Sequence, residues 1–266
     1  MKTYYSFVIG LPDLEFKLEL CSNIPALYPD ALKEELSPRE LEWAHLLWLK
    51  KYLHPIAYFL SSGISEGLPS EWPESTYNQD DELFDTLPLF LQKLVAWKKT
   101  EGKDSPYLQT MHRLQQYYFE ALLNSDNRFI QLWGDAELSM INFSAAQRAE
   151  RDGKNKTAHL IDGNYYKELL LEFSTNQKIC LTEYEFAVRL ASGIEKSDLL
   201  SKEMETDRMR WDTIDEINKF EYFTIDVVLG YFQKTLLLEK WKGLTLPEDP
   251  VNQLEVAKKL LKDRDI

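Results

Sequence analysis

The sequence predicts a mainly α-helical protein that folds as a compact bundle of several helices. Apolar residues recur three and four positions apart along most of its length, which is the spacing of one helix face. Segment 225–241 (IDVVLGYFQKTLLLEKW) is apolar on nearly every side, a pattern typical of a helix at the centre of an all-helical core. Extended patterns are scarce. Only 4–9 has the composition of a strand, and a lone strand has nothing to pair with.

Helix-start signals divide the chain into its elements. SPRE at 37–40 combines an N-cap serine, a proline at the first helical position and a glutamate that closes a capping box. SP at 105–106 repeats the cap and the proline, and TEYE at 182–185 repeats the box. With the apolar spacing, these signals predict helical runs at 41–59, 83–99, 108–122, 128–151, 164–174, 183–193, 198–220, 225–241 and 251–263.

The breaks between these runs indicate how the chain is organised. Segment 61–81 is rich in Gly, Pro, Ser and acidic residues, which predicts a long flexible loop. A chain of 266 residues is long enough to bury roughly three-quarters of its unfolded surface. We therefore expect a single mainly helical domain over 1–266, and 152–163 is the place where it could subdivide.

Composition and charge restrict the classes of partner. The 44 acidic residues outnumber the 31 basic ones and give a net charge of −13, which disfavours nucleic acid and anionic lipid and suits a basic protein. No stretch reaches the ~18 uncharged apolar residues of a membrane span, and no signal-peptide cleavage pattern follows the N-terminus. The isolated thiols Cys21 and Cys180 fit a reducing compartment and a place in the core. The expectation is a cytoplasmic protein with no direct membrane insertion.

No catalytic or cofactor-binding motif stands out. The chain lacks a Walker A loop, a dinucleotide fingerprint, a zinc-protease motif and a nucleophile elbow. Glu42 and His45 have the spacing used in dinuclear-iron bundles, but such a site needs a second pair and two further carboxylates. DDE at 80–82 lacks the ligand spacing of a calcium loop and fits the first turn of the next helix. We therefore expect no enzymatic activity, no cofactor and no metal.

The densest charge cluster, at 207–216, leaves two interpretations open. Asp207 lies in the middle of an apolar helical stripe, where a carboxylate must be solvated, paired or contacted by a partner. In one interpretation the charges form intrahelical pairs such as Arg208 with Asp212. In the other, Asp207 and Arg208, beside Trp211, fix one helix crossing or one protein contact.

The run at 128–151 is interrupted twice by residues that do not suit a buried helix face. Gly134 and Asp135 break the apolar pattern, and Asn142 interrupts it again about two helical turns further on. A kinked helix would explain both interruptions. Alternatively, a buried Asn142 could fix the register of helix packing.

Three stretches carry a family resemblance. YYSFVIGLPDLEF near the N-terminus, DRMRWDTIDE from 207, and FTIDVVLGYFQKTLLLEKW from 223 resemble an uncharacterised bacterial family. The members of this family are encoded beside V-type ATPase subunits in organisms such as Bacteroidetes and chlamydiae. The resemblance covers the chain nearly end to end.

A fourth stretch, DAELSMINFSAAQRAER from 135, is similar to the C (or d) subunit of archaeal and vacuolar-type rotary ATPases. In that subunit an acidic residue, an Asn and an Arg punctuate a helix in each repeat, and Asp135, Asn142 and Arg148 fill those places here. The resemblance implies a helical-repeat arrangement and a non-catalytic subunit that couples the central rotor shaft to the membrane ring. Its partners would be those ATPase subunits, at the cytoplasmic side of the inner membrane.

The alternative is an acidic helical scaffold or assembly factor that binds a basic protein or peptide. In this interpretation the loop at 61–81 exposes Trp72 and Tyr77, which form the contact surface.

Overall fold

Helices supply the regular structure of the protein. The computed structural model describes residues 4–16, 32–183, 186–193 and 199–242, and within these ranges it contains helices and short 3-10 turns but no strand. The prediction of a mainly α fold is confirmed. In chain order the elements are α1 (Tyr5–Gly10), α2 (Pro38–Leu49), η3 (Lys50–Tyr52), α3 (Leu53–Ser62), η4 (Glu74–Tyr77), η5 (Phe84–Thr86), α4 (Leu89–Lys99), α5 (Tyr107–Leu123), α6 (Arg128–Arg151), η6 (Lys156–Ala158), α7 (Tyr165–Glu172), α8 (Lys178–Glu183), α9 (Phe186–Gly193), α10 (Leu199–Asn218) and α11 (Ile225–Lys242).

Segment 4–9 has the composition of a strand but is helical in the structure. It forms α1, because a short helix satisfies its backbone groups internally whereas a lone strand leaves them unpaired. The helix is anchored at its start: the Tyr4 amide donates to the Phe223 carbonyl at 2.8 Å, and the Tyr4 hydroxyl donates to Glu40 at 2.5 Å. Glu40 also closes the predicted capping box at the start of α2.

The helix start predicted at 182–185 is wrong, because the chain is already helical from Lys178, in α8. Thr182 lies in the last turn of α8, where its hydroxyl donates to the Lys178 carbonyl at 2.8 Å, so it is not an N-cap. The predicted run at 251–263 and Cys21 lie outside the described residues.

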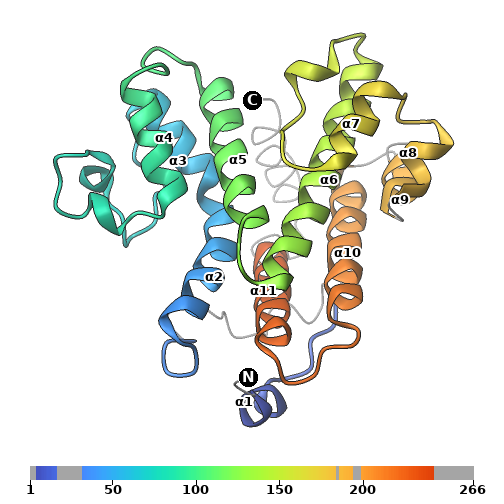
Figure 1. Ribbon diagram of the computed structural model, residues 1–266, viewed down its shortest axis with the longest axis horizontal. Helices are drawn as coiled ribbons and strands as arrows, with labels where there is room; N and C mark the ends of the chain where they lie inside the picture. Colours follow the sequence, from blue (N-terminus) through green and yellow to red (C-terminus); the bar gives the residue numbers. More distant parts are fainter. Residues whose placement is uncertain (1–3, 17–31, 184–185, 194–198, 243–266) are drawn as a thin grey trace, which may run out of the picture.

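Two groups of helices flank α6 and α11, which lie at the centre (Figure 1). α2 to α5 form one side and α7 to α9 the other, while α6 runs between them and packs against α5, α7, α9 and α10. α11 packs against α2, α6 and α10. α1 lies at the end of the molecule where the chain turns from α10 into α11 (Figure 1). The segment 207–241, singled out by the sequence, is therefore at the centre of the packing.

Close helix contacts require glycine at two positions. A Cβ atom on Gly134 would lie 2.7 Å from the Cβ of Leu122 in α5, and one on Gly230 would lie 2.2 Å from the Nδ2 of Asn218 in α10. Gly134 does not interrupt its helix, because α6 continues from Arg128 to Arg151. Its role is to let α5 and α6 approach closely.

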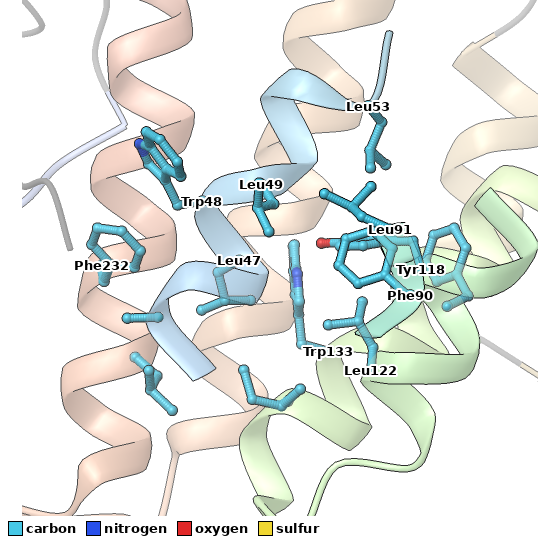
Figure 2. Close-up of a cluster of buried hydrophobic side chains, with 14 of the residues drawn as sticks. Leu47, Trp48, Leu49, Leu53, Phe90, Leu91, Tyr118, Leu122, Trp133 and Phe232 are labelled. Carbon is cyan, nitrogen blue, oxygen red and sulfur yellow. The ribbon is translucent and has the colours of Figure 1, made fainter. Parts of the chain in front are cut away.

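Buried apolar side chains form two clusters, and α6 contributes to both. The first joins α2 to α5 with the start of α6 and with α10 and α11. Trp133, which is fully buried, projects from α6 toward Leu47 and Leu49 of α2 and Leu122 of α5 (Figure 2). The second cluster joins the end of α6 to α7, α8 and α9, and it contains the buried thiol of Cys180. The single-domain organisation stays a prediction.

Trp72 and Tyr77 were predicted to be exposed, and this was wrong. They are only 6% and 5% exposed and belong to the first cluster. The ring of Tyr77 lies 5.5 Å from that of Phe59 in α3. The composition of 61–81 predicts irregular backbone, but large aromatic rings gain free energy by burial whatever the backbone around them. These residues therefore contribute to the core and do not form a contact surface.

α11 is apolar, and its apolar side chains are buried within the protein. Val228, Leu229 and Phe232 are almost completely enclosed by the helices around it. Among the helices of the described residues, none combines the length and the apolar run that are needed to cross a membrane.

Candidate functional site

A network of charges around two buried carboxylates joins four segments of the chain at the centre of the bundle. Its members come from η3, α6, α10 and α11, so they are far apart in sequence. Three carboxylates and three cations take part, and they balance in formal charge. The members are Lys50, Glu137, Glu203, Asp207, Arg210 and Lys240.

Asp207 is paired inside the helical body. Its side chain is 1% exposed, and both of its oxygens accept hydrogen bonds. Oδ1 accepts from Arg210 Nη1 at 2.6 Å, and Oδ2 accepts from Lys240 Nζ at 2.6 Å and from Trp241 Nε1 at 2.9 Å. Lys240 in turn donates to Glu203. Asp207 thus ties α10 to α11 through two donors on the last turns of α11.

Glu137 joins α6 to α10 in the same way. Its side chain is 1% exposed, and Arg210 donates to both of its oxygens at 2.9 Å, from Nε to Oε2 and from Nη2 to Oε1. Lys50 Nζ lies 2.5 Å from Oε1. The Arg210 guanidinium therefore bridges two buried carboxylates, one on its own helix and one on α6, in the forked geometry that only arginine provides.

The network keeps its carboxylates ionised. Burial alone would raise the pKa of Asp207, but the charges of Arg210 and Lys240 and their hydrogen bonds outweigh it and hold the pKa below its usual value. Burial is likewise outweighed at Glu137, where Arg210 and Lys50 lower the pKa. A saturated carboxylate that stays ionised near neutral pH is a poor general acid or base. The geometry is that of a structural joint.

These pKa shifts predict loss of stability in acid. The pKa values of Glu137, Asp207 and Glu203 are lowered in the folded protein, whereas in the unfolded chain they lie at about 4. The unfolded state therefore binds more protons, and the network's contribution is complete above about pH 5 and is lost as the pH falls through the lower folded values. Urea unfolding over a pH series should show this decline. It should be shallower in Asp207→Asn than in Glu216→Gln, an exposed control, and equal slopes would contradict the assignment.

The pairing partly corrects the interpretation of the charge cluster. Asp207 pairs with Arg210 and not with Arg208, which is exposed and lies over the Phe16 ring at 5.9 Å. The pair predicted between Arg208 and Asp212 does not form, since Asp212 accepts from Arg189 at 2.6 Å. Trp211 is 8% exposed and packs under the ammonium of Lys234 at 4.5 Å.

The three α6 residues singled out by the C-subunit resemblance lie at different depths. Asn142 is fully buried and holds the chain at Ile161, accepting from its amide and donating to its carbonyl, both at 2.9 Å. Asp135 is partly exposed, and its carbonyl accepts from Asn164 at 3.2 Å. Arg148 is exposed near the end of the helix. Asn142 thus fixes a connection between α6 and the segment before α7.

The residues weighed as metal ligands in the sequence make ordinary contacts in the structure. Glu42 accepts from Arg39 at 2.6 Å, and His45 packs near Trp48 with ring centroids 6.1 Å apart. Asp81 caps the turn before η5, accepting from the Leu83 amide at 2.8 Å. In the described part of the chain, no three His, Cys, Asp or Glu side chains are grouped as metal ligands.

A cavity of about 580 Å³ adjoins the network between α2, α10 and α11. Its walls combine apolar side chains with the paired charges, and the Nε1 of Trp48 and the Oε1 of Gln233 are buried there without a hydrogen-bond partner. The network thus lies beside a mostly apolar cavity, and the charges on its wall are already paired.

Comparisons with known proteins identify the family but not an activity. No curated protein and no solved structure matched the chain. Residues 1–247 match a family described as "Protein of unknown function (DUF2764)". Because the match covers most of the 266 residues, the chain belongs to the DUF2764 family.

Proposed function

We propose that this protein is a non-catalytic accessory subunit of a V-type rotary ATPase, which stands in for the C subunit between the central rotor shaft and the membrane ring. The proposal rests on the resemblance of the stretches at 4–16, 207–216 and 223–241 to proteins encoded beside such ATPases. It places the protein in the cytoplasm, held against the inner membrane by the complex.

The observation that carries the proposal is the central ionic joint. A subunit that transmits torque must keep its helix crossings fixed under load. Separating Arg210 from Glu137 and Asp207 would leave each buried carboxylate with a single cation, Lys50 or Lys240, at a cost of about 3–5 kcal/mol. The crossings of η3, α6, α10 and α11 are thus held by interactions that resist gradual deformation.

The end of the molecule at the α10–α11 turn offers a contact surface. Phe220 and Tyr222 are 80% and 72% exposed, and Tyr5 of α1 is exposed beside them, with its ring 4.7 Å from that of Phe223. Exposed aromatic rings grouped in this way are typical of protein interfaces. Because this end is directly continuous with the ionic joint through α10 and α11, force applied there reaches the centre of the bundle.

The test is a pulldown of the tagged protein from its native cell, with mass spectrometry of the proteins recovered. We expect rotor-shaft, catalytic-head or ring subunits in the eluate. The double change Phe220→Ser and Tyr222→Ser should reduce their recovery. The control double change Leu89→Ser and Tyr165→Ser removes two residues that are 67% and 66% exposed elsewhere, and should not.

Two results would count against this function. Recovery without any ATPase subunit would rule out the proposed role. Recovery of a different basic protein instead would favour the acidic scaffold or assembly factor, which the net charge of −13 also suits.

A further inference from the structure

A second cavity, of about 760 Å³, lies between the end of α6, the segment after α7, α9 and α10. It shares no lining residue with the ionic network. Its volume is within the range of small-molecule sites, roughly 300–1,000 Å³. Nothing in the ATPase role requires it.

Most charges on the wall of this cavity are already neutralised. Lys156 pairs with Glu150 at 3.0 Å, and Glu150 also accepts from the Thr175 amide and hydroxyl. Arg189 pairs with Glu205 at 2.8 Å and with Asp212 at 2.6 Å. These groups form the frame of the cavity and leave little net charge to attract or repel a ligand.

Two cations on the wall have no carboxylate partner among the described residues. They are Arg148, from the last turns of α6, and Lys202, from the first turns of α10. The amide of Gln147 also lines the cavity, and its Oε1 is buried without a hydrogen-bond partner. In a chain of net charge −13, two unpaired cations from different helices at one cavity are an unusual concentration of hydrogen-bond donors.

We propose that this cavity binds a small phosphorylated molecule, with its phosphate group at Arg148 and Lys202. A phosphate dianion offers several acceptor oxygens and enough charge for both cations, and arginine matches it with two parallel hydrogen bonds. The amide of Gln147 can also donate after a flip of its side chain. Leu190 and Met209 also line the cavity and supply apolar contact for the organic part of the ligand.

Besides the paired Glu150 and Glu205, a third acidic residue, Glu172, lines the cavity and disfavours a ligand that carries several negative charges. The exposed carboxylate of Glu172 would repel a second phosphate more than an uncharged sugar or ring. The site therefore fits a monophosphate attached to an organic group better than a polyphosphate.

The test uses the full-length protein and three probes: inorganic phosphate, pyrophosphate and AMP. Thermal melts and titration calorimetry are run in a low-chloride buffer at matched ionic strength. We expect at least one probe to raise the melting temperature above that of a sodium chloride control. Arg148→Ala and Lys202→Ala should each weaken its binding about tenfold, as loss of one charge-assisted hydrogen bond does, and Arg148→Lys should retain part of it.

The control is Lys103→Ala, which removes an exposed cation remote from the cavity and should leave binding unchanged. The proposal is overturned if none of the three probes stabilises the wild-type protein beyond sodium chloride. It is also overturned if the double change Arg148→Ala and Lys202→Ala binds as well as the wild type. Because the isolated chain is used, neither result depends on its association with an ATPase.

Discussion

Replacing Arg210 by methionine should lower the free energy of unfolding by about 3–5 kcal/mol. The change keeps most of the aliphatic volume but removes the guanidinium that bridges Glu137 and Asp207, both 1% exposed. Lys50 and Lys240 remain, one at each carboxylate, and they cannot supply the three lost N–H donors. Two buried carboxylates are then undersatisfied, which is among the most costly defects in a folded protein. Guanidinium unfolding followed by circular dichroism measures the change.

Arg208→Met is the matched control for this prediction. It makes the same substitution two residues away on the same helix, at an exposed position outside the network. We expect an effect within about 0.5 kcal/mol. A double-mutant cycle of Glu137→Gln with Arg210→Met should also give a large favourable coupling free energy. If Arg208→Met and Arg210→Met destabilise the protein equally, the loss of the ion pairs of Arg210 is not what lowers the free energy of unfolding.

Replacing Trp133 by alanine should lower the free energy of unfolding by about 3–5 kcal/mol. Trp133 is fully buried where α6 meets α2 and α5 (Figure 2), and the Lys50 ammonium lies 5.9 Å from its ring. Its loss leaves a large void beside Gly134, where α5 and α6 are already too close to collapse further. Chemical denaturation gives the magnitude.

Trp43→Ala provides the comparison for the tryptophan prediction. Trp43 in α2 is half-buried, and its indole donates to Asp126 at 3.1 Å at the surface. We expect a clearly smaller loss than for Trp133→Ala, because less apolar area returns to water and no cavity is enclosed. An equal loss would mean that the burial of Trp133 is not what stabilises the contact between the helices.

The sequence predicted most helices because local signals determine them. The capping box at Ser37 and the apolar spacing of 128–151 and 225–241 each lie within one segment and correspond to α2, α6 and α11. Composition failed where tertiary contacts decide. Segment 4–9 is helical and docks on Phe223, and the aromatics of 61–81 are buried in a core that no local pattern reveals.

The site could be predicted only in part. Asp207 was marked by its place on an apolar stripe, and Arg210 was visible three residues further along the same helix. Lys240 was one of the few charges in an apolar run. Glu137 and Lys50 gave no signal, because each looks like an ordinary helix-surface residue until the bundle brings it to Arg210. Which residues on other helices become partners is decided by how the helices pack, and no local pattern in the sequence shows which distant residues will meet.

In the proposed function, the ionic network serves to transmit torque. A rotary machine needs a rigid coupling subunit, and a charge-balanced network around two buried carboxylates holds helix crossings in place. The phosphate site proposed at Arg148 and Lys202 lies on α6 and α10, two of the helices that the joint connects. Ligand binding there would stabilise the packing of α6 against α10 at a second place, beside the second hydrophobic cluster.

The most direct test of the central claim is the mass of the intact complex. A V-type ATPase is purified from the native cell through a tag on its rotor-shaft subunit, and the assembly is weighed by native mass spectrometry. The proposed role predicts that the complex includes one or more copies of this 31.3 kDa chain. Deleting the gene for this chain should lower the mass of the complex by that amount for each copy. An intact complex of the same mass with and without the gene would contradict it.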